Sequence, residues 1–204
     1  MKLGILLVMA SLAFPACAAP EKEPVATASA DTEETVPDES PRVALDTDKG
    51  KIVVELNAIK APKSVESFLD NVRTGFYDGT VFHRVIAGFM IQGGGYDVEG
   101  RLKPTNKMVV NEADNGLGNV RGTIAMARKN DPNSASVQFY INHVDNPSLD
   151  HTGKSLQGWG YAVFGLVVEG MEVVDAIAAS PPNRKNPPVV IRSASVLTDS
   201  EGGS

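Results

Sequence analysis

The sequence contains little of what metal and redox chemistry requires, with a single cysteine and three histidines in 204 residues. One cysteine can form neither an intramolecular disulfide nor a thiolate metal cluster. The spacing of His83, His143 and His151 is not typical of a zinc site. A net charge of −6 gives no support to nucleic acid as a partner. We therefore expect no metal site and no nucleic-acid partner.

The negative charge is concentrated near the N-terminus. Seven of the acidic residues lie between Ala18 and Pro41, and the chain after Pro41 is almost neutral, with eighteen acids and seventeen bases. Residues 20–41 are rich in Glu, Ala, Thr, Ser and Pro and poor in large apolar side chains. Such a segment cannot bury enough apolar surface to offset its ordering entropy. We predict a disordered acidic linker at 20–41 that holds the domain away from a membrane.

Residues 1–19 have the pattern of a bacterial export signal. Lys2 precedes the apolar run Leu3–Phe14, which is too short for a comfortable membrane span. Two processing routes remain open. Cys17 could be lipidated as the mature N-terminus, although Phe14–Ala16 matches the lipobox poorly, or Ala16–Ala18 could be an ordinary cleavage site. We expect an exported, periplasmic protein, anchored by lipid to a bacterial membrane on the first route.

Beyond residue 41 the chain reads as one domain, 42–199, with a flexible tail at 200–204. Pro62 is suited to the first turn of a helix, and an apolar stripe follows it up to Gly75. A second helix is predicted at Met171–Ala179. The predicted strands are 42–47, 51–56, 81–86, 89–92, 123–127, 137–142, 162–168 and 189–197. Many short strands with two isolated helices favour a mainly β fold, a closed antiparallel barrel capped by helices.

Four blocks of sequence, in order along the chain, resemble the cyclophilins. They are residues 82–94, 121–128, 134–142 and 156–165, and the fourth looks like the bacterial branch of the family. The resemblance implies an eight-stranded barrel with two helices and a shallow groove for an X-Pro segment. It also implies a peptidyl-prolyl cis-trans isomerase without a cofactor. We expect a monomer of the exported bacterial branch that binds proline-containing segments and assists the folding of exported proteins.

Rotation about an X-Pro bond meets a barrier of about 18–20 kcal/mol but breaks no bond. The reaction needs an apolar recess for the proline ring and a donor that favours the twisted amide. Arg84 matches the family's catalytic arginine, and arginine suits the role because it stays charged and presents fixed planar donors. The resemblance also implies a set of substrate-binding residues. These are Phe89, Met90, Tyr140 and Leu149 at the recess, Gln92 and Gln138 on the substrate backbone, and Ala127, Arg128 and Tyr161 beside them.

The chain departs from the family at several of these positions. Ser148 stands where many members have tryptophan, and losing that apolar wall predicts weak cyclosporin binding. Tyr140 replaces the usual phenylalanine, so its hydroxyl needs water or a partner. Tyr161 stands where many relatives have histidine. Arg128 replaces an asparagine, a change that we expect to alter the preference for the residue before proline.

Two further functions remain open. The groove could be a binding module for Pro-containing segments, or the acidic tail could recruit clients to a membrane-anchored chaperone. Arg84 together with Gln92 and Gln138 favours the enzyme, because a pure binder has no need of a donor beside the prolyl nitrogen. Met90 and Gln92 are two residues apart, so both face one side of a strand. The same spacing relates Gln138 to Tyr140.

Overall fold

The computed structural model describes residues 40–105, 107–183 and 187–198. The chain divides into residues 1–36 and 37–204, and every described residue belongs to the second unit. The export signal with Cys17, nearly all of the linker and the tail at 200–204 lie outside the described residues. Among those that are described, no helix is both long and apolar enough to cross a membrane.

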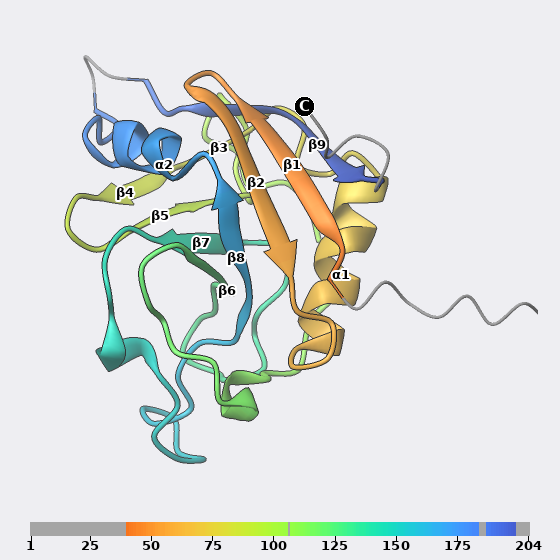
Figure 1. Ribbon diagram of the computed structural model, residues 1–204, viewed down its shortest axis with the longest axis vertical. Helices are drawn as coiled ribbons and strands as arrows, with labels where there is room; N and C mark the ends of the chain where they lie inside the picture. Colours follow the sequence, from red (N-terminus) through yellow and green to blue (C-terminus); the bar gives the residue numbers. More distant parts are fainter. Residues whose placement is uncertain (1–39, 106, 184–186, 199–204) are drawn as a thin grey trace, which may run out of the picture. The chain divides into compact units, whose positions relative to one another are not determined.

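The described residues form a single antiparallel sheet of nine strands that curls into a barrel-like shape (Figure 1). The strands are β1 (Arg42–Thr47), β2 (Gly50–Leu56), β3 (Thr80–Val81), β4 (Arg84–Ile86), β5 (Met90–Gly93), β6 (Thr123–Met126), β7 (Phe139–Asn142), β8 (Val163–Glu169) and β9 (Val190–Leu197). They pair in the order β3-β9-β1-β2-β8-β6-β7-β5-β4. The mainly β fold with two helices is as predicted, but the sheet has nine strands where eight were expected.

The additional strand arises because the segment predicted as one strand, 81–86, is two. β3 pairs with β9, whereas β4 pairs with β5 at the other end of the sheet. Between them the Phe82 amide donates to the Val189 carbonyl at 2.9 Å, and the Phe82 side chain is fully buried. The two edge strands are therefore consecutive in the chain. Among the described residues no ladder pairs β3 with β4, and the backbone at Phe82–His83 joins the two edges of the curled sheet.

Helix α1 (Pro62–Arg73) packs beside β9. Pro62 occupies its first turn, where the backbone amides have no partner within the helix, so the missing amide hydrogen of proline costs no hydrogen bond. Its apolar stripe is buried as the spacing predicts, through Val65, Phe68, Leu69 and Val72. The chain leaves the helix through Gly75, whose φ of +65° lies in the left-handed region that favours glycine.

Helix α2 (Met171–Ala178) packs against β2, β4 and β5. It ends one residue earlier than predicted and buries Val173, Val174, Ile177 and Ala178. Two short 3-10 turns were not predicted, η1 (Ala113–Asn115) and η2 (Pro147–Leu149). Of these, η2 carries Leu149 to the site described below.

The strands separate two apolar clusters because successive side chains point to opposite faces of a sheet. Ile91 of β5 and Phe139 of β7 belong to the main core, with Phe68, Tyr77, Phe82 and Phe164. Their neighbours Met90 and Tyr140 lie in a smaller cluster with Ala125 and Val163. This second cluster is outside the main core, and it forms the base of a surface pocket.

Candidate active site

A pocket of about 230 Å³ lies over the second apolar cluster. Its lining consists of Arg84, Phe89, Met90, Gln92, Ala127, Arg128, Tyr140, Leu149 and Tyr161. These are all of the substrate-contact and catalytic residues predicted from the sequence, except Gln138. Gln138 is adjacent, because the Nε2 of Gln92 donates to its Oε1 at 3.0 Å. The structure thus brings together residues that are up to 77 positions apart.

Three neighbouring strands place a guanidinium, an amide and an aromatic ring side by side. Arg84 of β4 is directly opposite Gln92 of β5, which is directly opposite Tyr140 of β7. Side chains opposite each other in an antiparallel pair have Cβ atoms about 4.5–5.5 Å apart. Arg84 is exposed, and its Cζ lies 6.0 Å from the centre of the Phe89 ring. Its Nη1 approaches the Met90 Sδ at 3.8 Å.

The tight turn between β4 and β5 carries Phe89 to the pocket. The Phe89 amide donates to the Ile86 carbonyl at 3.1 Å, and Gly88 has a φ of +72°. The Phe89 carbonyl accepts from the His143 amide at 3.0 Å and from the Asn146 Nδ2 at 2.9 Å. The Gly88 amide donates to the Nδ1 of His143 at 3.1 Å. His143 and Asn146, which follow β7, therefore hold both the amide of Gly88 and the carbonyl of Phe89.

The hydroxyl of Tyr140 has a buried partner. It donates to the Oδ1 of Asn119 at 2.6 Å, so the hydroxyl that tyrosine adds at this position has the hydrogen-bond partner that burial requires. Burial raises the pKa of Tyr140 well above its usual value of 10.0, so the hydroxyl remains a donor. Asn119 is itself held by Asp150, whose Oδ1 accepts from both its backbone amide and its Nδ2. No pattern in the sequence singled out Asn119.

Arg128 and Tyr161 form another wall of the pocket. The Arg128 Cζ lies 4.6 Å from the centre of the Tyr161 ring, and its Nε donates to the Gly160 carbonyl at 2.8 Å. The Tyr161 ring meets that of Tyr140 edge to face at 5.8 Å, and its amide donates to the Leu149 carbonyl at 3.0 Å. The wall is therefore built from the segment after β6, the end of η2 and the segment before β8.

His83 is not part of this pocket. Its ring lies 4.6 Å from that of Tyr96, and together they line a separate hollow of about 430 Å³. Burial lowers the pKa of His83, which favours the neutral imidazole. Within the described part of the chain, no three His, Cys, Asp or Glu side chains are grouped so that they could hold a metal ion.

The site combines an apolar recess with an exposed guanidinium and a fixed amide. A recess of this size suits a small ring, and the adjacent donors suit the backbone of a bound peptide. The fold and the site therefore define a small β-barrel protein with a peptide-binding groove. Residues 42–196 match the family described as "Cyclophilin type peptidyl-prolyl cis-trans isomerase/CLD". The chain belongs to this family and is a peptidyl-prolyl cis-trans isomerase.

Curated relatives and solved structures agree with this assignment. The chain is 56% identical over 162 residues to the peptidyl-prolyl cis-trans isomerase cyp18 of Streptomyces antibioticus, covering 76% of this chain and 98% of the relative. It is 56% identical over 135 residues to peptidyl-prolyl cis-trans isomerase B of Escherichia coli K12, covering 66% and 82%.

A crystal structure of a cyclophilin-type isomerase from Cryptosporidium parvum matches with a TM-score of 0.64 at 27% identity, covering 78% of this chain and 99% of that one. A second structure of that protein, obtained in the presence of the dipeptide Ala-Pro, matches with a TM-score of 0.62.

Proposed function

We propose that this pocket isomerises X-Pro bonds by seating the proline ring in the recess while Arg84 donates a hydrogen bond to the prolyl nitrogen. The recess is formed by Phe89, Met90, Tyr140 and Leu149. The observation that carries the proposal is the position of Arg84 at the rim of this recess, across the ladder from Gln92.

The amide nitrogen changes its electronic structure as the X-Pro bond rotates. In the planar amide the nitrogen lone pair is delocalised, and it becomes localised when the bond twists. The twisted nitrogen is therefore the better hydrogen-bond acceptor, and a fixed guanidinium stabilises it more than it stabilises the planar substrate. Arg84 is exposed in the free protein, and a bound peptide would cover it and strengthen the interaction. Gln92, fixed by Gln138, would hold the substrate backbone.

The test compares Arg84→Ala and Arg84→Lys with the wild type, using exchange of an X-Pro tetrapeptide. Removing one donor aimed at the transition state costs about 10²–10³ in rate. We expect that loss for Arg84→Ala, and only partial rescue by lysine, which lacks the planar fork. Arg73→Ala is the matched control, since Arg73 lies at the end of α1 and does not line the pocket. If Arg84→Ala kept full activity, the proposed role of Arg84 would be wrong.

We further propose that the protein belongs to the exported bacterial branch and assists the folding of exported proteins. Lys2 and the apolar run that follows it support export, and the position of Cys17 just after that run supports lipid attachment. Mass spectrometry of the mature N-terminus separates the two processing routes. A lipid-modified Cys17 would indicate membrane anchoring, whereas an unmodified terminus after Ala18 would indicate a soluble periplasmic enzyme.

Weak cyclosporin binding and a monomeric state complete the proposal. Ser148 is exposed on η2 beside Leu149 and does not line the pocket, so no large apolar side chain extends the recess there. Inhibition at nanomolar cyclosporin would contradict this, and Ser148→Trp should strengthen inhibition. Sedimentation of the domain at several concentrations tests the monomer.

A further inference from the structure

We infer that the active site prefers X-Pro segments with an acidic residue directly beside the proline. This inference rests on the proposed function and specifies its substrate class. The observation behind it is the charge of the pocket. Its lining includes two arginines, Arg84 and Arg128, and no acidic residue.

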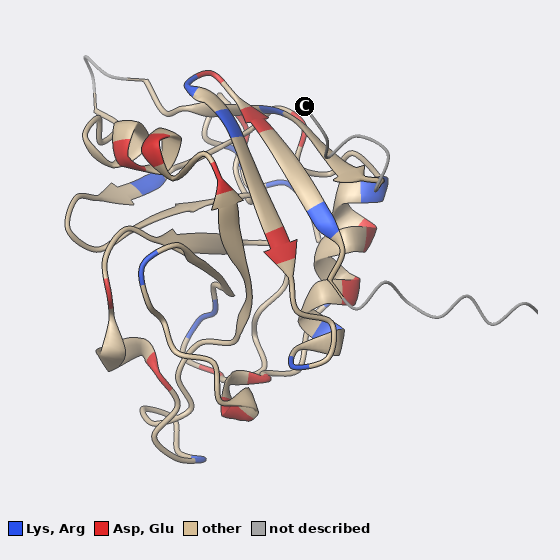
Figure 2. Ribbon diagram, in the orientation of Figure 1, with Lys and Arg blue, Asp and Glu red and all other residues tan. Residues whose placement is uncertain are grey.

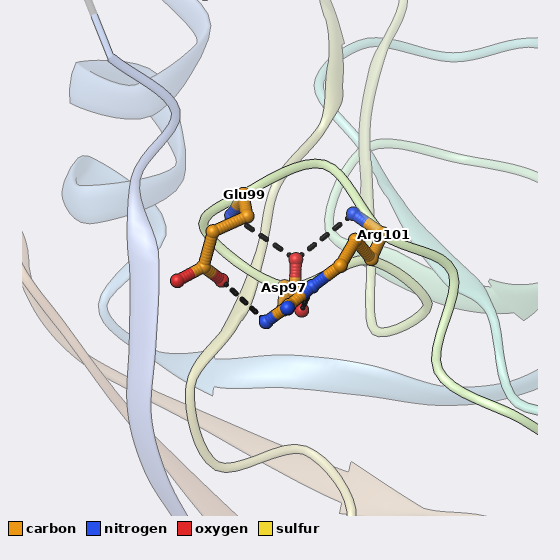
Figure 3. A network of polar contacts seen from close by, with 3 residues as sticks. All are labelled: Asp97, Glu99 and Arg101. Carbon is orange, nitrogen blue, oxygen red and sulfur yellow. Dashed lines mark hydrogen bonds and ion pairs between the residues drawn. The ribbon is translucent and has the colours of Figure 1, made fainter.

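The two arginines differ from most others in the described part of the chain. Figure 2 shows acidic and basic residues interspersed over the elements of the domain. Most arginines have a carboxylate partner there. Asp97 and Glu99 both bind Arg101 (Figure 3), and the other pairs are Arg42–Glu55, Arg121–Asp175 and Arg192–Asp48. Among the described residues, no carboxylate lies within ion-pair distance of Arg84, Arg128 or Arg73, and two of these three arginines line the active site.

Arg128 is already held in position for a ligand. Its Nε donates to the Gly160 carbonyl at 2.8 Å and its Nη1 to the Lys129 carbonyl at 3.0 Å, while its guanidinium lies over the Tyr161 ring. These contacts fix the guanidinium, and its Nη2 makes no hydrogen bond with another described residue. A carboxylate that reaches Nη2 would therefore meet a donor whose side-chain entropy has already been lost.

Two acidic side chains on these loops do not line the pocket and are hydrogen-bonded to amide groups. Asp150 accepts two hydrogen bonds from Asn119, and the Oδ1 of Asp131 accepts from the Asn133 amide within its own loop. Lys129, the exposed residue after Arg128, does not line the pocket. The positive charge that a substrate meets in the pocket is therefore that of the two arginines in its lining, while Asp150, linked to Tyr140 through Asn119, keeps its negative charge.

A glutamate or aspartate next to the proline would pair with this charge, and a lysine would be repelled. Partly exposed ion pairs shift a rate or binding constant by about two- to fivefold. We expect kcat/KM to be higher by that factor for the glutamate peptide than for the glutamine peptide. For the lysine peptide we expect kcat/KM to be lower than for the glutamine peptide. Because the pair is partly exposed, the preference should decline as ionic strength rises.

The experiment measures kcat/KM for tetrapeptides that carry Glu, Gln or Lys directly before or directly after the proline. Each peptide is tested at low salt and at about 1 M salt, where the screening length falls to about 3 Å. Two neutralising variants, Arg128→Gln and Arg73→Gln, remove one positive charge each. We expect Arg128→Gln to abolish the preference for glutamate, and Arg73→Gln to retain it.

Four outcomes are informative. A salt-sensitive preference for glutamate in the wild type that Arg128→Gln alone removes supports the inference. Equal kcat/KM for the Glu, Gln and Lys peptides would overturn the inference while leaving the isomerase intact. A preference that persists in Arg128→Gln would refute the role of Arg128. No exchange of any peptide would instead refute the proposed function. The salt series uses the wild type and does not depend on the folding of a variant.

Discussion

His143 should control how well the enzyme binds substrate, although it does not line the pocket. Its Nδ1 accepts the Gly88 amide at 3.1 Å, so this nitrogen has no hydrogen, and its Nε2 lies 3.1 Å from the Oδ1 of Asp175. The side chain therefore links the turn that carries Phe89 to helix α2. We consider His143 a positioning residue for Phe89.

The magnitude follows from the contacts that His143→Ala would remove. The contact with Asp175 and the hydrogen bond from Gly88 are both lost, but only the second acts directly on the turn, and one neutral hydrogen bond contributes about 1 kcal/mol. The backbone bond from residue 143 to the Phe89 carbonyl remains, as does the bond from Asn146. If the whole cost falls on the turn, the fraction of molecules with Phe89 in place declines by up to about fivefold, and KM rises by the same factor. The value of kcat should stay the same because Arg84 is untouched.

Two further variants separate positioning from general destabilisation. His143→Asn puts an acceptor oxygen close to the place of Nδ1 and should restore KM, whereas His143→Gln places its amide farther out and should not. The measurements are KM and kcat for an X-Pro peptide and the NMR shift of the Gly88 amide hydrogen. If the Ala and Asn variants have the same KM and the same Gly88 shift, the reasoning is refuted.

Two other predictions concern single contacts. Gly95→Ala places a methyl group 2.5 Å from the Cγ of Gln138, so this side chain must move and release Gln92. Activity should fall while the melting temperature changes little, and an unchanged KM and kcat would count against a role for Gln138. The hydrogen bond from Arg121 lowers the pKa of Asp175. The stability from this pair is complete above about pH 4 and is lost as the pH falls through the folded pKa. The melting temperatures of wild type and Asp175→Asn should therefore converge on acidification, and a constant gap would contradict this.

Local pattern was enough to predict most of the fold. The two-residue spacing of Met90 and Gln92, and of Gln138 and Tyr140, predicted that each pair faces one side of a strand, and the structure places Met90 and Tyr140 together in the second cluster. The ends of strands were harder to predict where a backbone group bonds to a distant side chain instead of to the neighbouring strand. The carbonyl of Val137 accepts the buried hydroxyl of Tyr77 at 2.9 Å, and the strand predicted from 137 begins only at Phe139. No short window of sequence contains that partner.

The residues that line the pocket were predicted through the family resemblance, but their supports were not. Asn119 meets Tyr140 across 21 positions, and Gly88 meets His143 across 55. Both supports are loop residues whose neighbours depend on the register of distant strands. A polar residue in a loop is usually solvated, so its type alone carries no sign of such a role.

The arrangement of the site explains why a sheet surface can perform this reaction. No proton or electron is transferred, so the protein has only to bind the substrate and stabilise the twisted amide. Arg84, Gln92 and Tyr140 are cross-strand neighbours, and their spacing is set by the hydrogen-bond ladder. The proposed donor and the part of the recess formed by Met90 and Tyr140 therefore share the rigidity of the sheet. Arg128 and Leu149 instead belong to loops, which can change without altering that spacing. We therefore expect substrate preference to vary at these loop positions while the twisted amide is stabilised in the same way.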